Sequence, residues 1–96
     1  MAQPVVDGNL KPLGYQQIVG LAAATALTVP ANARIAYIEP EAQAVRWRDD
    51  GTNPTAAIGQ PLPVGRMLVY VGNLNAIKFI QQAATANLNV TYFTDA

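Results

Sequence analysis

The residues best able to do chemistry lie together in residues 45–55, whose sequence is VRWRDDGTNPT. Guanidinium groups such as those of Arg46 and Arg48 bind phosphates or carboxylates through paired hydrogen bonds. The neighbouring carboxylates of Asp49 and Asp50 offer cation binding or acid–base chemistry. Two kinds of site are therefore conceivable in this stretch, one for an anion and one for a cation or a proton transfer.

The cation or acid–base site is the weaker of the two. A calcium loop of the EF-hand type needs acids at alternate positions, a glycine at the sixth and a later glutamate. Here Gly51 is third after Asp49, and no glutamate follows. The chain has no histidine, cysteine or serine, which removes the common nucleophile pairs and the nitrogen and sulfur ligands of zinc. We expect turn-capping aspartates, no catalytic residue, no metal and no cofactor.

The charge balance limits the partners. Six basic and six acidic residues give a net charge of zero, whereas nucleic-acid binding needs an excess of positive charge. The apolar residues 21–27 are too few to span a bilayer, and no signal-peptide pattern opens the chain. We therefore expect synthesis in the cytoplasm, with neither a nucleic acid nor a membrane as partner.

Charged residues make up 12% of the chain and hydrophobic ones 51%, against about 25% charged in an average domain. Either Asn, Gln, Thr and Ala cover the surface, or copies and partners cover part of it, because charge is depleted at interface cores. We favour the second explanation.

Short apolar segments separated by Gly, Pro and Asn predict an all-β chain. The expected strands cover residues 15–19, 27–29, 33–39, 43–48, 57–58, 67–71, 77–82 and 88–93. Seven to eight short strands at such spacing indicate an antiparallel β-sandwich or a small barrel. We place this single domain at residues 14–96. Residues 1–13 carry prolines and scattered apolar side chains and are predicted to form an extended N-terminal arm, or else a frayed end.

Two strands carry specific expectations. In residues 88–93, alternation predicts that Leu88, Val90 and Tyr92 point inward. Residues 67–71 are continuously apolar, as in a central strand covered on both faces. On a free sheet edge this uncharged window would invite pairing with another chain, so it is either central or used in assembly.

Residues 33–48 are predicted to form a hairpin. Pairing Ile35 with Trp47 and Tyr37 with Val45 gives a coherent apolar face, which places Trp47 in the core. The alternative for Trp47 is an exposed sugar-stacking platform. The same register gathers three arginines on the opposite face: Arg34, Arg46 and Arg48. Like charges so arranged require acids, supplied either by Asp49, Asp50 and the 39–41 turn or by a neighbouring subunit.

Several stretches between residues 27 and 93 carry a resemblance to a known kind of protein. They are LTVPA at 27–31, AVRWRDDGTNPT at 44–55, IGQPL at 58–62, IKFI at 77–80 and NVTYF at 89–93. In these stretches the chain resembles small structural proteins of phages and prophages. Such proteins are similar to the β-sandwich, jelly-roll-like decoration or cement proteins of tailed bacteriophages, which sit on the capsid lattice.

This resemblance implies a non-enzymatic virion protein on the capsid exterior. Its expected partners are the major capsid protein of the same virion and further copies of itself, as a dimer or trimer. The candidate interface residues are Val5, Val6, Leu10, Arg34, Arg46, Arg48, Asp49 and Asp50. The alternatives are a tail or baseplate component and a receptor-binding, carbohydrate-binding β-sandwich.

Overall fold

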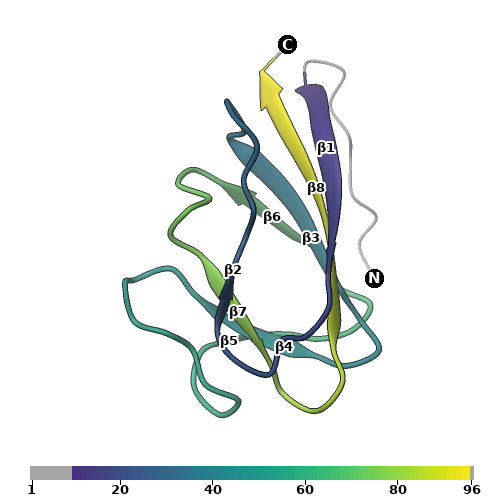
Figure 1. Ribbon diagram of the computed structural model, residues 1–96, viewed down its shortest axis with the longest axis vertical. Helices are drawn as coiled ribbons and strands as arrows, with labels where there is room; N and C mark the ends of the chain where they lie inside the picture. The colour runs from purple at the N-terminus through teal and green to yellow at the C-terminus, as the bar shows by residue number, and fades with distance from the viewer. Residues whose placement is uncertain (1–9, 96) are drawn as a thin grey trace.

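The computed structural model describes residues 10–95, which form two antiparallel four-stranded sheets packed face to face (Figure 1). The strands are β1 (Leu10–Ile18), β2 (Thr25–Ala26), β3 (Ile35–Glu41), β4 (Val45–Arg48), β5 (Gln60–Leu62), β6 (Leu68–Val71), β7 (Lys78–Gln81) and β8 (Asn87–Asp95). The expected all-β sandwich is confirmed. Within the described residues no helix is long and apolar enough to cross a membrane.

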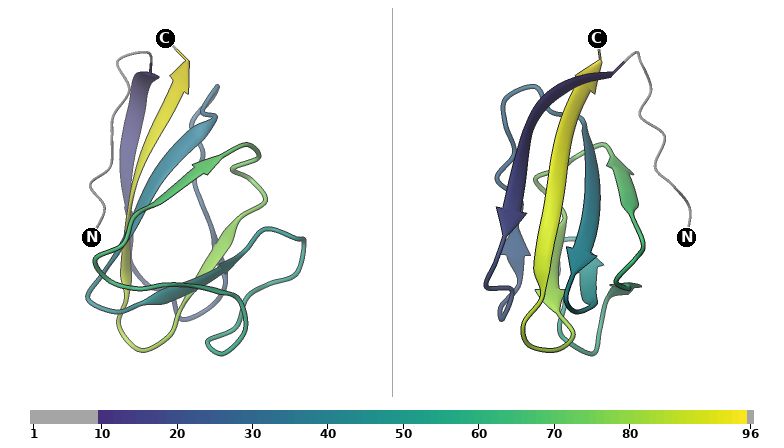
Figure 2. Two further views of the ribbon diagram at one scale, coloured as in Figure 1. Left: turned by 180° about the vertical axis from the view of Figure 1, so that it is seen from behind. Right: turned by 90° about the vertical axis from the view of Figure 1, so that its right-hand side faces the viewer.

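The first sheet has the order β1-β8-β3-β6 and the second the order β2-β7-β4-β5. Figure 2 (right) shows the strands of the first sheet side by side, with the long β8 running nearly the height of the molecule and β1 beside its upper part. In almost every connection the chain passes from one sheet to the other, and β4 and β5 are the consecutive strands that pair. This pairing matters because the residues between them form the candidate site.

Strand β8 supplies the middle of the core. Leu88 and Val90 are fully buried and Tyr92 nearly so, which confirms their expected inward orientation. From the second sheet, Val45 of β4 and Phe79 of β7 face them and are also fully buried. Apolar side chains from both sheets therefore form one core, as the hydrophobic effect requires of two sheets with one apolar face each.

The predicted hairpin of residues 33–48 is wrong, because β3 and β4 lie in different sheets. Strand β3 pairs with β6 and β8, whereas β4 pairs with β5 and β7. The error came from the turn, because residues 39–41, predicted as part of a turn, belong to strand β3. The face assigned to β3 was also wrong. Ala36 and Ile38 are fully buried in the core, while Tyr37 turns to the outer side and packs on Phe93 with ring centroids 4.9 Å apart. Both faces of β3 are apolar, so alternation alone did not identify the core side.

Strand β6 is an edge strand, not the central strand expected from its apolar sequence. It pairs with β3 alone, and Val69 and Val71 are 47% and 59% exposed. A short apolar run fits a buried strand and an edge strand equally well when periodicity is the only signal. The remaining expectation for this apolar window is use in assembly.

Residues 10–13 belong to β1 and not to an arm. Pro12 is accommodated because β1 is an edge strand, and the register with β8 shifts between Pro12 and Gly14. Residues 1–9, where Val5 and Val6 are expected to form an arm, lie outside the described residues.

Candidate functional site

Residues 49–59, here called the β4–β5 loop, connect two paired strands. Trp47 lies opposite Gln60 in the ladder, so the two ends of the loop are neighbours. A compact loop of this length with adjacent ends is an Ω-type loop, a class that is frequently functional.

Arg46 holds the β4–β5 loop against the outer side of strand β4. Its Nε donates to the Ala56 carbonyl oxygen at 3.1 Å, and its guanidinium NH1 donates to the Gly59 carbonyl oxygen at 2.9 Å. A guanidinium group offers several donors in a fixed fork, so a single side chain can hold two points of a loop. Arg46 is thus engaged within the chain and serves to order the loop.

Gly59 makes the close approach of the loop possible. Its φ is +143°, a conformation that residues with a side chain rarely adopt. A Cβ at this position would lie 3.1 Å from the Trp47 carbonyl oxygen and 3.2 Å from the Cβ atoms of both Arg46 and Pro54. The loop therefore returns to β4 with no room for a side chain at residue 59.

Two further groups order the loop. The Thr55 hydroxyl accepts from the Ile58 amide at 2.9 Å, and the Thr55 amide donates to the Ile58 carbonyl oxygen at 2.8 Å. Lys78 of β7 donates to the Asn53 side-chain oxygen at 3.2 Å. The capping expected of the aspartates is made in part by Asp50, whose Oδ1 accepts from the Thr52 amide at 3.5 Å, and Thr55 caps the later part of the loop.

Arg48 and Asp50 form a two-point ion pair. The Arg48 Nε lies 3.0 Å from Asp50 Oδ1, and its NH2 lies 2.5 Å from Oδ2. The hydrogen bonds from Arg48 lower the pKa of Asp50, and those to Asp50 raise the pKa of Arg48. Of the two sources of carboxylate considered from the sequence, the internal one is present for Arg48.

Arg34 does not join the other two arginines. It precedes β3 in the first sheet, where it forms an exposed ion pair with Asp95. The predicted cluster of three arginines is therefore wrong. The third cation beside Arg46 and Arg48 is instead Lys78, which lies opposite Arg48 in the β4–β7 ladder. The sequence could have identified it, because Lys78 stands between buried Ile77 and Phe79 and so belongs to the outer face of its strand.

Trp47 lies at the margin of the core. Val45 on the same side of β4 is fully buried, whereas Trp47 packs against the core and stays partly exposed. Its ring meets Tyr70 of β6 edge-on, with centroids 6.2 Å apart. The Tyr70 hydroxyl donates to Asp49 Oδ2 at 2.7 Å, and this bond raises the pKa of Tyr70. Asp49 and Trp47 thus join the second sheet to the edge of the first.

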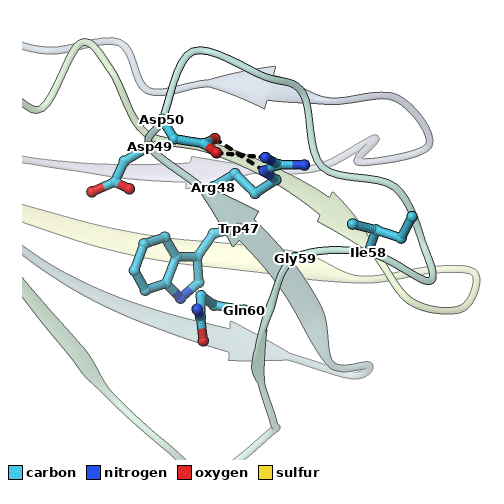
Figure 3. A pocket seen from close by; sticks show the side chains of 7 residues that line it. All are labelled: Trp47, Arg48, Asp49, Asp50, Ile58, Gly59 and Gln60. Carbon is cyan, nitrogen blue, oxygen red and sulfur yellow. Dashed lines mark hydrogen bonds and ion pairs between the residues drawn. The ribbon is translucent and has the colours of Figure 1, made fainter.

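These side chains surround a pocket of about 460 Å³ (Figure 3). Its lining residues are Trp47, Arg48, Asp49, Asp50, Ile58, Gly59 and Gln60. In Figure 3 the Trp47 ring lies beside the Asp49 carboxylate and the Gln60 amide, and Ile58 stands at the far side. An aromatic ring with carboxylate and amide groups suits a neutral polar ligand such as a sugar or a peptide. No group of three or more potential metal ligands occurs among residues 10–95.

The candidate interface residues are thus dispersed over the molecule. Arg46, Arg48, Asp49 and Asp50 meet at the pocket and its loop, while Arg34 lies in the other sheet and Leu10 is the half-buried first residue of β1. Sequence reasoning named Tyr70 with Trp47 only for a possible sugar-stacking platform, and it did not single out Gln60 or Ile58 for this site. Comparisons with protein families, with curated proteins and with solved structures give no match to this chain.

Proposed function

We propose that the chain is a non-enzymatic virion protein that decorates and stabilises the outside of a tailed-phage capsid, and that its two sheets form a jelly roll. The strand order carries the proposal. Eight antiparallel strands in the orders β1-β8-β3-β6 and β2-β7-β4-β5 match a sandwich wound from two Greek keys. That architecture is used by viral capsid proteins and by lectins. Architecture alone does not define function, so the surface must support the proposal as well.

The surface favours association with protein. Several large apolar side chains are exposed within the described residues: Tyr15, Val19, Ile58, Val64, Val69 and Val71. Charged residues make up only 12% of the chain, and its net charge is zero. Burying such side chains against a partner is favourable at about 25 cal/mol per Å² of apolar surface. The loop is also held by its own hydrogen bonds, so little conformational entropy would be lost on binding.

The mechanism follows from mass action. A decoration protein stabilises the lattice of the major capsid protein if it binds the assembled lattice but not the free subunits. The stabilisation grows with the logarithm of the ratio between the concentration of the decoration protein and its dissociation constant for the lattice. The exposed Ile58 lies near the end of the loop, across the pocket from the carboxylates of Asp49 and Asp50, and offers an apolar anchor beside polar groups. Interfaces commonly have that composition, an apolar centre with a polar rim.

Co-sedimentation tests the proposal directly. The full chain is mixed separately with empty capsids and with tails of the phage that encodes it. We expect saturable binding to capsids and none to tails, and binding to tails alone would assign the chain to the tail. Ile58→Asp should weaken capsid binding at least tenfold. Ala22→Asp, which adds the same charge at an exposed alanine between β1 and β2, should leave it intact.

The pocket favours a second candidate, a carbohydrate-binding module. Trp47 is partly exposed and lies with Asp49 and Gln60 around one hollow, which supplies a ring and hydrogen-bonding groups for a sugar. Titration with oligosaccharides of the bacterial surface, followed by tryptophan fluorescence, separates the two functions. Saturable quenching that Gln60→Ala abolishes would support sugar binding. An unchanged spectrum would reject sugar binding and leave capsid decoration as the remaining candidate function.

A further inference from the structure

The two sheets have four edge strands, and three of them carry features that discourage pairing with another chain. Strand β1 carries Lys11 and Pro12 and an irregular register. Strand β2 has only two residues, and β5 has three with Pro61 in the middle. Short strands, prolines, lysines and irregularities are the usual means of protecting a sheet edge. Strand β6 has none of them, since its residues LVYV carry no charge and no proline.

Within residues 10–95, the backbone of β6 has unused hydrogen-bonding groups at its open side. The Gly72 amide donates to the Arg34 carbonyl oxygen at 3.0 Å, at the end of the ladder with β3. In an antiparallel ladder the bonded residues alternate, so Tyr70 and Leu68 also bond to β3. Val69 and Val71 then direct their amides and carbonyls away from β3. Among the described residues β3 is the only strand that pairs with β6, so this side of its backbone is open there.

We propose that β6 pairs with β6 of a second copy of this chain, antiparallel across a two-fold axis at Tyr70. In this register Val69 of each copy lies opposite Val71 of the other. These are the two residues with unused backbone groups, so both pairs can exchange two hydrogen bonds each. The two first sheets become one continuous sheet of eight strands, because each contributes the four strands β1-β8-β3-β6.

A second copy suits this edge because the edge is complementary to itself. A two-fold axis brings the same residues together twice, so a charge near the axis would meet its own copy. Strand β6 has no charge to repel, and Gly72 at its end is also uncharged. The opposed valines form cross-strand pairs of β-branched residues, which stabilise a sheet. The inference goes beyond the capsid role and does not depend on it.

The expected affinity is modest. Val69, Tyr70 and Val71 of each chain pair across the axis, so the interface is smaller than the standard size of about 1,200–2,000 Å². We therefore expect a dissociation constant on the order of 1–100 μM. Such a dimer forms at the high local concentration of an ordered array and dissociates in dilute solution.

Sedimentation of the full chain over a range of concentrations tests the proposal. We expect a monomer–dimer equilibrium that Val71→Lys weakens at least tenfold, because lysine at an edge opposes pairing. Val19→Lys adds the same charge at an exposed valine next to β1 and should leave the equilibrium unchanged. A wild-type chain that stays monomeric at millimolar concentration would overturn the proposal, as would an equal effect of the two substitutions.

Amide hydrogen exchange of the wild-type chain gives a second measurement that does not depend on a variant folding. The Val69 and Val71 amides should become protected as concentration rises, while the exposed loop amide of Val64 should not. A dimer without this protection would place the interface elsewhere. Protection that appears only when capsids are added to a monomeric chain would assign the edge to a strand of the capsid protein, and the second copy would be rejected.

Discussion

Substitution of Gly59 by alanine tests whether the β4–β5 loop is packed on strand β4 as described. The added Cβ would lie 3.1 Å from the Trp47 carbonyl oxygen and 3.2 Å from two further carbon atoms. Those neighbours are backbone or the first atoms of side chains, so none can swing away. The loop would have to lift off the strand, and the hydrogen bond from Arg46 to the Gly59 carbonyl would lengthen.

The magnitude has two contributions. A residue with a side chain at a φ of +143° costs of the order of 1–3 kcal/mol in backbone strain. Overpacking against fixed neighbours costs about 1–3 kcal/mol more. Together they predict a loss of about 2–6 kcal/mol. For a domain of this size each kcal/mol lowers the melting temperature by about 4–8 °C, so Gly59→Ala should melt at least about 8 °C below the wild type.

Two other glycines provide matched controls. Gly51 is in the same loop with a φ of +88° but has no atom within 4 Å of a built Cβ, so Gly51→Ala carries backbone strain alone. Gly14 has neither a close neighbour nor a positive φ, and Gly14→Ala should be nearly neutral. Thermal melts followed by circular dichroism should rank the losses as Gly59 above Gly51 above Gly14. Equal losses for Gly59→Ala and Gly51→Ala would refute the close packing of the loop.

Three further substitutions test the core and the ion pair. Burial raises the pKa of Tyr92 to about 12, so the unfolded chain loses its tyrosine proton first and stability should fall by about 1.4 kcal/mol between pH 8 and pH 11; urea unfolding of Tyr92→Phe over the same pH interval should show a smaller fall. Trp47→Ala should lower the free energy of unfolding by about 3 kcal/mol, the lower end for a large aromatic truncation, because the ring is partly exposed. An unchanged urea midpoint would contradict the packing of Trp47 against the core. Arg48→Ala should melt close to the wild type at pH 7, because its ion pair is solvent-exposed. Any difference should vanish as the pH falls through the lowered pKa of Asp50, so a large loss at pH 7 that persists in acid would show that Arg48 stabilises the fold in another way.

Strand β8 shows why part of the fold could be predicted from the sequence. Leu88, Val90 and Tyr92 alternate with Asn89 and Thr91, so only one face is apolar and the core side is defined. Strand β3 has no such contrast, since Tyr37 lies between Ala36 and Ile38. The wrong face was therefore used to set the register of a hairpin that the structure does not form. The partners of a strand depend on long-range packing, which a single strand's pattern does not contain.

The candidate site was located by its unusual composition but not by its geometry. The sequence indicated a polar, ordered loop after β4, and the hydrogen bonds of Arg46 and Thr55 agree with that expectation. The roles of Lys78 and Tyr70 were missed, because both reach the loop from strands distant in the sequence. Only the strand order brings β6 and β7 beside it.

The internal pairing of the cationic groups changes where an interface should be sought. Arg46 binds loop carbonyls, Arg48 binds Asp50, and Lys78 binds Asn53, so each has a partner within the chain. A partner that recruited these cations would first have to displace those bonds, which offsets the gain from new ones. The apolar side chains have no such cost, because water is their alternative neighbour. Recognition through exposed Ile58 at the loop and through the edge of β6 therefore agrees better with the structure than recognition through the arginines.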